Sequence, residues 1–393
     1  MIHAFIFAAT PHIHFGAGKR SQLSSIIRPY GHRVLLVTGG ASFDNSPLCQ
    51  ALFDELKGQF DLHRISISGE PSPQQVDDTV AECSAAPPDC VVAIGGGSPV
   101  DAAKAIAGLL PSGDSVMEYL EGVGHGKTYS GPSTPFIALP TTAGTGGETS
   151  KNAVLSVIGK NGFKKSFRHE QLVARHIILD PELTLSCPAK VTAACGMDAF
   201  TQLLESYLSR HASPMTDALA LSGMQKVARS LPAAIADGAN LSARADMLYA
   251  SSVSGLTLAN AGLGSVHGLA SPIGACFPIP HGEVCGSLLF EATRLNIEAM
   301  QSREPDNIGL FKYAEAGRIM SNDHSLGDEA ARQQLLTLLE QWTTEFHMPL
   351  LSDYGITEDD IPVLIAHASS GSMKTNPVTL TDAETGELIQ SRL

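Results

Sequence analysis

Short apolar runs alternate with amphipathic segments through the first half of the chain. The runs are rich in Val and Ile, and turn residues follow each of them, which predicts strands at 33–38, 63–67, 90–94, 135–139 and 176–179. Apolar residues at helical spacing predict helices between them, at 46–58, 74–85 and 99–110. The apolar residues 1–9 are expected to form a first strand. This alternation is typical of a doubly wound α/β domain, which binds ligands at the carboxyl ends of its strands.

The pattern changes after residue 185 to long helical periodicities with no further strand. Helices are predicted at 190–210, 213–236, 242–261, 283–299 and 327–346. A length of 393 residues is enough for two to three domains. We therefore predict an α/β N-terminal domain over residues 1–185, an all-α domain over residues 186–393, and a cleft between them.

Composition and charge narrow the choice of partners. Hydrophobic residues make up 43% and charged residues 17% of the chain, as in a globular protein. The net charge of −14 would repel phosphate backbones and anionic lipid, so no nucleic acid partner is expected. Seven scattered cysteines without a CxxC pair indicate reduced thiols in a cytoplasmic protein. No Lys or Arg precedes Lys19, so the N-terminus lacks the basic region of a secretory signal.

The stretch 247–282 contains no Asp, Glu, Lys or Arg. Gly, Ser, Asn, His and Pro interrupt its apolar runs well before the ~18 to 20 residues that a membrane span requires. We therefore expect no membrane partner. Buried helices beside a site are the better interpretation, because the stretch keeps two histidines.

Two glycine-rich loops follow predicted strands. Gly95, Gly96 and Gly97 lead through Ser98 to a helix, whose free amides would suit a pyrophosphate and whose dipole suits Asp101. After Pro140, five hydroxyl side chains and three glycines offer donors to a phosphate or ribose. Either loop alone could be a structural turn, and neither has the GxGxxG or P-loop spacing. Together they favour a nucleotide site.

A second group of residues resembles a metal site. Asp198, Gln202 and Glu205 are spaced along one face of a predicted helix. On one straight helix His267 and His281 would lie ~21 Å apart, too far to share an ion, but three prolines can break that helix: Pro272, Pro278 and Pro280. Satisfied core histidines and a buried hydrogen-bond acceptor remain the alternative.

Together these segments resemble the iron-containing (group III) alcohol dehydrogenase family over essentially the whole chain. The matching motifs are Gly95–Lys104, Pro140–Glu148, Leu179–Leu183, Gly196–Phe200, Pro280–Gly282 and Asn376–Val378. The resemblance implies a Rossmann-like N-terminal domain and a helical C-terminal domain in a dehydroquinate synthase-like architecture. It also implies NAD(P)-dependent interconversion of alcohols with aldehydes or ketones in the cleft. It also implies a homodimer or larger homo-oligomer.

The resemblance assigns cofactor contacts residue by residue. Gly96, Gly97 and Ser98 would hold the pyrophosphate, and Leu183 would lie against the adenosine. The phosphates, ribose or nicotinamide would contact Thr141, Thr142, Thr145, Asn152 and Lys165. Asp101 and Gly39 complete the expected cofactor site.

Asp198, His267 and His281 match three of the family's four metal ligands. Two positions differ from the family: Gln202 stands where it usually has His, and Ser271 where it has a further His linked to proton transfer. An amide oxygen is a weaker ligand than imidazole, so Gln202 is expected to be a weak fourth ligand or an outer-shell donor to Fe²⁺ or Zn²⁺. His267 and Ser271 are the expected catalytic positions.

The sequence thus predicts a metal-dependent NAD(P)-linked alcohol dehydrogenase or aldehyde reductase, acting on a small, uncharged alcohol or carbonyl compound. The metal would act as a Lewis acid on the substrate oxygen. Alternatives are a dehydroquinate synthase-like lyase, a maleylacetate reductase-like enzyme and a nucleotide-binding protein without turnover. The first two bind anionic substrates, and the absence of cations from 247–282 argues against them.

The segment Val37–Ser42 bears on the choice between NAD and NADP. Many NAD-preferring relatives carry Asp at the position of Gly39, where a carboxylate would repel a 2′-phosphate. Gly removes that repulsion, and Ser42 can donate to the phosphate. We therefore expect NADP(H) to be accepted and preferred, unless Gly39 only shapes a turn.

Overall fold

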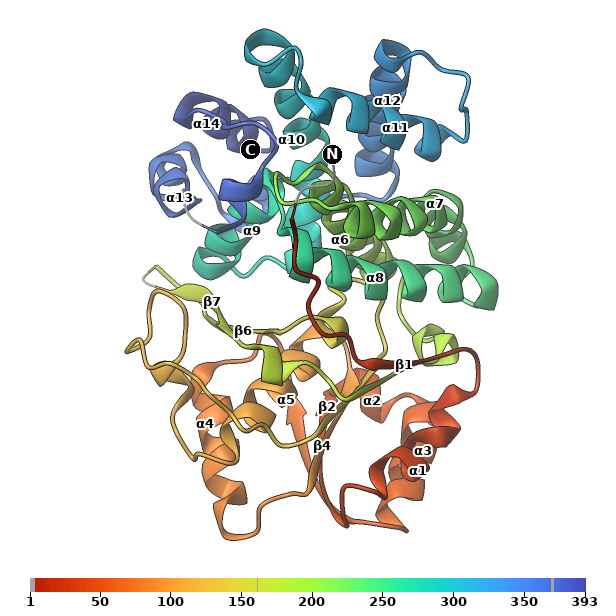
Figure 1. Ribbon diagram of the computed structural model, residues 1–393, viewed down its shortest axis with the longest axis vertical. Helices are drawn as coiled ribbons and strands as arrows, with labels where there is room; N and C mark the ends of the chain where they lie inside the picture. The colour runs from red at the N-terminus through yellow and green to blue at the C-terminus, as the bar shows by residue number, and fades with distance from the viewer. Residues whose placement is uncertain (1–3, 161, 369–370) are drawn as a thin grey trace.

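A computed structural model describes residues 4–160, 162–368 and 371–393. It has two lobes, an α/β lobe built from the first half of the chain and a helical lobe built from the second (Figure 1). The predicted fold class, with a parallel sheet first and helices afterwards, is confirmed. The division at residues 185 and 186 stays a prediction. None of the described helices is long and apolar enough to cross a membrane.

The sheet of the α/β lobe has six strands in the order β1-β8-β5-β4-β2-β3, and every pairing is parallel. The strands are β1 (His12–Phe15), β2 (Arg33–Gly39), β3 (Asp61–Ile67), β4 (Cys90–Gly95), β5 (Phe136–Pro140) and β8 (His176–Leu179). Strands β3 and β4 pair with β2 on opposite sides. The strand order reverses between β2 and β4, which is where such sheets bind nucleotides.

Helices cover both faces of this sheet. They are α1 (Leu23–Ile27), α2 (Ala41–Asp44), α3 (Pro47–Lys57), α4 (Pro73–Glu82) and α5 (Gly97–Leu109). Residues of α1 and α3 share one buried cluster with the sheet, and residues of α4 and α5 share the other. Because both faces are buried, the central strands read as continuous apolar runs rather than as alternating ones.

Two parts of the α/β lobe differ from the sequence prediction. The N-terminal strand was placed wrongly: residues 1–3 lie outside the described residues, residues 4–11 have no regular structure, and β1 begins only at His12. Segment 4–11 instead runs toward the helical lobe (Figure 1), where the Ala8 amide donates to Asn260 Oδ1 at 2.6 Å. An antiparallel hairpin of β6 (Asn152–Val157) and β7 (Phe163–Arg168) was missed, because the cationic β7 lacks a clear apolar alternation.

The helical lobe contains no strand among its described residues. Its helices are α6 (Ala189–Leu208), α7 (Pro214–Ala236), α8 (Leu241–Ala261), α9 (Ser265–Cys276), α10 (His281–Arg303), α11 (Ile308–Ser321), α12 (Asp328–Glu345), α13 (Ile361–Ala368) and α14 (Asp382–Gln390). Their apolar faces form one large core. The helix that carries both histidines is broken as expected, but after Cys276; Pro272 itself lies inside α9. Only Pro278 and Pro280 fall within the break.

Helix α8 packs directly on the second glycine-rich loop and so joins the two lobes. A Cβ at Gly255 would overlap the carbonyl of Gly146, a residue with a φ of 60°. The Thr149 hydroxyl donates to the Ser252 carbonyl of α8 at 2.9 Å. Because two backbones meet here, the loop has a fixed position relative to the helical lobe.

We predict that Gly255→Ala destabilises the protein by about 1–3 kcal/mol, the usual cost of overpacking, although Ala normally favours a helix. It should also raise the dissociation constant for NAD(P)H, because Gly146 can yield only by moving the loop. Chemical unfolding and fluorescence titration measure the two effects. Gly386→Ala in α14 is the control, since its Cβ meets only ordinary contacts. Equal stability in both variants would show that the close approach is unimportant.

Candidate active site

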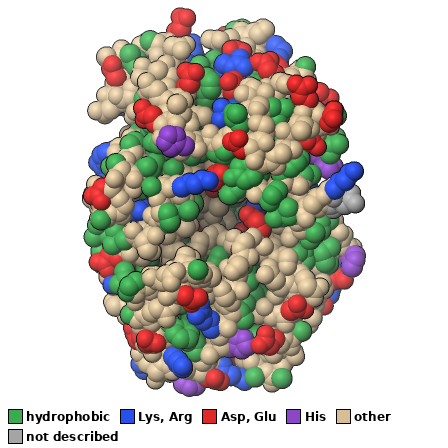
Figure 2. Space-filling model, turned by 180° about the vertical axis from the view of Figure 1, so that it is seen from behind, with side chains coloured by type: hydrophobic (Ala, Val, Ile, Leu, Met, Phe, Trp, Pro, Cys, Tyr) green, Lys and Arg blue, Asp and Glu red, His purple; other side chains and the backbone are tan. Residues whose placement is uncertain are grey.

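A cavity of about 1090 Å³ lies between the carboxyl ends of the strands and the helical lobe. The surface is hollowed near the middle of one face (Figure 2). Both lobes contribute to the cavity wall, and the predicted site residues that line it are Gly97, Ser98, Asp101, Thr145, Asn152, Lys165, Asp198, Gln202, His267, Ser271 and His281. The two glycine-rich loops and the candidate metal ligands therefore line the same cavity.

The two glycine-rich loops lie against each other. Strand β4 ends at Gly95, whose carbonyl accepts from the Thr141 amide at 2.9 Å. A Cβ on Gly96 would come within 3.2 Å of the Thr142 hydroxyl, and one on Gly97 within 3.2 Å of the Thr145 hydroxyl. The glycines thus leave the amides at the start of α5 accessible, which suits a phosphate group.

Lys104 connects α5, which follows the first glycine-rich loop, to the second glycine-rich loop by hydrogen bonds. Its side chain is completely buried, and its ammonium donates to the carbonyl oxygens of Gly147 (2.6 Å) and Asn152 (2.5 Å). Burial also raises the pKa of Asp101 to about 6 and that of Glu148 to about 7, despite the neighbouring ammonium. A single buried cation therefore connects α5, the second loop and strand β6.

The remaining predicted cofactor residues lie in different settings. Asn152 is on β6 and Lys165 on β7, at the cavity wall; Lys164 also lines the wall and forms an ion pair with Glu70 at 3.0 Å. Leu183 is 2% exposed and belongs to the core beneath the sheet rather than to the cavity wall. Gly39 ends β2, next to the strand-order reversal.

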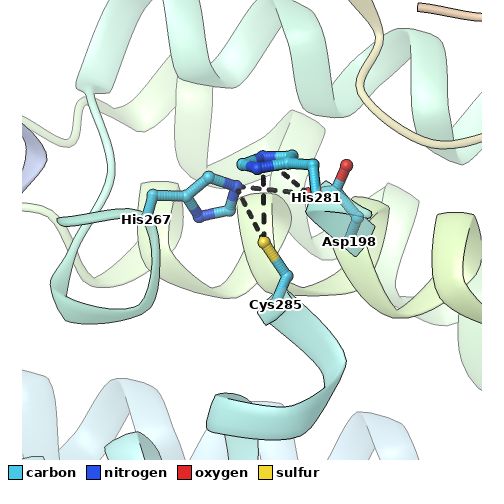
Figure 3. A group of neighbouring side chains, drawn as sticks. All are labelled: Asp198, His267, His281 and Cys285. Atoms are coloured by element: carbon cyan, nitrogen blue, oxygen red, sulfur yellow. Dashed lines mark hydrogen bonds and ion pairs between the residues drawn. The ribbon is translucent and has the colours of Figure 1, made fainter. Parts of the chain in front are cut away.

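Three of the predicted metal ligands converge on one point (Figure 3). The Nε2 atoms of His267 and His281 lie 3.2 and 3.8 Å from Asp198 Oδ1. Asp198 comes from α6, His267 from the first turn of α9 and His281 from the first residue of α10. The break between α9 and α10 therefore brings His267 and His281 to one point, whereas one straight helix would hold them ~21 Å apart.

A fourth donor atom lies in the same place. Cys285 Sγ is 3.7 Å from His267 Nε2 and 3.8 Å from His281 Nε2. The four donor atoms all lie within 4.8 Å of one another. Carboxylate, imidazole and thiolate groups at such separations suit a divalent transition metal.

Glu205 orients His267 from behind. Its Oε2 accepts from His267 Nδ1 at 2.7 Å, and its Oε1 accepts from the Val266 amide at 2.7 Å. One carboxylate thus satisfies a free amide at the start of α9 and leaves Nε2 of His267 directed at Asp198. Such a partner fixes the tautomer of a ligating histidine.

The pKa values of this cluster reflect its burial. Burial, with Lys164 and His267 nearby, lowers the pKa of His281 to about 4, although Asp198 opposes this shift. Burial opposes ionisation of Asp198, yet the two imidazoles hold its pKa below the usual value. Burial raises the pKa of the Cys285 thiol to about 12. A cation at this point would change that balance, because metal binding releases protons from its ligands.

The two positions that depart from the family lie at the site. The Gln202 carboxamide donates from Nε2 to Asp198 Oδ1 at 3.4 Å, and its Oε1 lies 3.0 Å from the Ser254 hydroxyl. Ser271 is exposed on α9 and faces the cavity. His367, which the sequence analysis did not select, also lines the cavity from α13.

Sequence reasoning missed the roles of Lys104, Glu205 and Cys285. Glu205 shares a helix face with Asp198, but nothing in the sequence shows that it meets a histidine 62 positions later. Cys285 stands one helical turn after His281, and this i, i+4 spacing could have identified it. Lys104 is recognisable only once the loop around Gly147 is folded over it.

Comparison with known proteins adds independent evidence. The family model described as "Iron-containing alcohol dehydrogenase" matches residues 10–181, and the model "Fe-containing alcohol dehydrogenase family, C-terminal" matches residues 192–393. Long-chain-alcohol dehydrogenase 1 of Geobacillus thermodenitrificans is 32% identical over 95% of this chain and 93% of its own length. NAD-dependent methanol dehydrogenase of Bacillus methanolicus is 29% identical over 96% and 97%.

Solved structures are similar over the whole chain. A 1,3-propanediol oxidoreductase has a TM-score of 0.88 at 28% identity, with both chains fully covered. Sulfoacetaldehyde reductase from Bifidobacterium kashiwanohense, solved with NAD⁺, has a TM-score of 0.83 at 28% identity, with 99% of each chain covered.

We predict that Glu205→Gln weakens Zn²⁺ binding about 10- to 100-fold, the usual effect of losing an outer-shell partner. Gln offers one oxygen to two donors, so either the imidazole or the Val266 amide loses its acceptor. Competition with a chromophoric chelator measures the affinity. The exposed Glu340→Gln serves as control. An unchanged affinity in Glu205→Gln would remove the carboxylate from the metal site.

Proposed function

The chain belongs to the iron-containing alcohol dehydrogenase family, and we propose that it interconverts small alcohols with aldehydes or ketones, with NAD(H) or NADP(H) as the hydride partner. The observation that carries this proposal is the common cavity. Two loops suited to a dinucleotide and a group of metal donors line the same space. A protein that only bound a nucleotide would not need the group of metal donors.

The site residues divide into two tasks. The amides of the loop at Gly96–Ser98 and the hydroxyls of Thr142 and Thr145 would hold the cofactor, and Asn152 and Lys165 would contact its phosphates, ribose or nicotinamide. Asp198, His267 and His281 would hold a divalent ion, Fe²⁺ or Zn²⁺, which supplies Lewis acidity to the substrate oxygen when bound. The cofactor supplies the hydride chemistry, and the fold supplies the alignment.

An uncharged substrate suits the charges around the metal donors. Lys164, the cation beside His281, is already neutralised by Glu70. Lys190 at the cavity wall pairs with Glu283 at 3.0 Å. An anionic substrate that bound at either of these cations would have to displace its carboxylate, which leaves Lys165, assigned here to the cofactor, as a cavity-wall cation without an ion pair among the described residues. This favours a dehydrogenase of simple alcohols over a lyase or reductase that binds phosphate or carboxylate groups.

Location and assembly follow from the same interpretation. All seven cysteines are free, which suits a reducing cytoplasm. The family likeness favours a homodimer or larger homo-oligomer.

The proposal is tested by turnover. Purified protein is stripped with a chelator, reloaded with Fe²⁺ or Zn²⁺ and assayed with a panel of alcohols and aldehydes through the absorbance of NADH or NADPH. We expect oxidation of primary alcohols or reduction of aldehydes that is lost on stripping and restored by metal. Full activity in metal-free protein, unchanged in Asp198→Ala, would exclude the metal-dependent mechanism.

We further propose that NADP(H) is accepted and preferred. Gly39 ends β2 beside Ser42, and its neighbour Gly40 lies against Ser68. The Ser66 hydroxyl also points to this strand end, donating to the Gly39 carbonyl at 3.1 Å. These hydroxyl groups can donate hydrogen bonds to a 2′-phosphate, and there is no carboxylate among them to repel it.

Gly39→Asp should lower kcat/KM for NADPH at least about tenfold relative to NADH, since ~1.4 kcal/mol of repulsion is enough for that factor. Gly39→Asn, with the same shape but no charge, should keep the preference of the parent. Steady-state kinetics with both cofactors measure the ratio. A parent enzyme with clearly higher kcat/KM for NADH would show that the preference is wrong.

A further inference from the structure

Cys285 occupies the place that a fourth metal ligand would take. We propose that its thiolate is the fourth protein ligand of the metal, together with Asp198, His267 and His281, and that Gln202 is not a ligand. The inference rests on the proposed metal-dependent function, and it concerns which side chains of this chain hold the ion.

The separations of the donor atoms fit this arrangement. With bonds of ~2.3 Å to sulfur and ~2.0 to 2.1 Å to nitrogen or oxygen, a tetrahedral site places sulfur ~3.5 Å from nitrogen and nitrogen ~3.4 Å from oxygen. Cys285 Sγ lies 3.7 and 3.8 Å from the two imidazole nitrogens. Those nitrogens lie 3.2 and 3.8 Å from Asp198 Oδ1. These four separations are therefore within about 0.4 Å of those in a tetrahedral site, and all the donor atoms lie within 4.8 Å of one another.

The local structure aims the sulfur at this point. Cys285 is 0% exposed and stands one turn after His281 on α10, so both side chains face α6 (Figure 3). Its sulfur lies within hydrogen-bonding distance of both imidazoles. No other cysteine among the described residues belongs to a group of donors able to hold a metal.

Gln202 is engaged in a different way. Its Nε2 donates to Asp198 Oδ1, the oxygen that both imidazoles face, and its Oε1 meets Ser254. The carboxamide thus supports Asp198 from the side. This arrangement makes it an outer-shell group that orients the carboxylate.

A thiolate ligand has chemical consequences. Carboxylate and thiolate together neutralise a dication, whereas one carboxylate with three imidazoles leaves it positive. Thiolate also favours Zn²⁺ and other borderline-soft ions over hard ions such as Mg²⁺ and Mn²⁺. We therefore expect Zn²⁺ to be retained more firmly than the loss of the family histidine alone would suggest.

Cobalt substitution tests the ligand directly. The full-length protein is stripped, loaded with Co²⁺ and examined by absorption spectroscopy, and the Zn²⁺ form is examined by X-ray absorption. We expect a near-ultraviolet thiolate-to-cobalt charge-transfer band and one sulfur at about 2.3 Å from zinc. Cys285→Ser should lose the band and bind Zn²⁺ at least about tenfold more weakly. The control Cys49→Ser makes the same change at a buried cysteine of the α/β lobe. It should keep both the charge-transfer band and the affinity for Zn²⁺.

The outcomes separate this inference from the proposed function. One Co²⁺ per chain without the charge-transfer band, and unchanged affinity in Cys285→Ser, would overturn the thiolate ligand while leaving a metal-dependent enzyme. Failure of the wild-type protein to bind any metal would overturn both. If Cys285→Ser does not fold, the zinc–sulfur distance in the wild-type protein decides the question alone.

Discussion

The carboxylate of Asp198 lies among two imidazoles and a thiol at the wall of the cavity, where only 2% of the residue is exposed. A buried charge is costly unless it is paired and hydrogen-bonded. The arrangement of α6, α9 and α10 follows from this constraint, because each helix brings one or two donors to the same point. Glu205 then serves both the start of α9 and the ring of His267. The chain break between α9 and α10 thus brings His267 and His281 to the same carboxylate oxygen.

The second half of the catalytic apparatus is held by a different buried group. Lys104 joins α5 to the loop around Gly147 and to β6, while α8 lies directly on Gly146. The two glycine-rich loops are therefore fixed both to the sheet and to the helical lobe. Under the proposed function, this double anchoring would fix the distance between the bound cofactor and the metal. Hydride transfer depends on such alignment rather than on any single side chain.

The sequence predicted the elements that depend on local patterns. Strands β2, β4 and β8 and helices α6, α7 and α8 begin and end within about two residues of the expected bounds. The hairpin of β6 and β7 and the position of β1 were missed, because an edge strand and a cationic strand carry little periodic signal. Asp198, His267 and His281 were singled out from the sequence pattern, and the family resemblance then assigned them as metal ligands. Cys285, one helical turn after His281, was overlooked, and only its contact with His267 depends on how α9 and α10 fold back.

The central claim is that one cavity aligns a nicotinamide with a metal held by the helical lobe. Anomalous diffraction at the zinc edge, from crystals grown with Zn²⁺ and NADPH, tests it most directly. The account predicts an anomalous peak among Asp198, His267, His281 and Cys285, with the nicotinamide ring in the same cavity and the pyrophosphate at Gly96–Ser98. A zinc peak elsewhere, or a cofactor bound away from these donors, would contradict it.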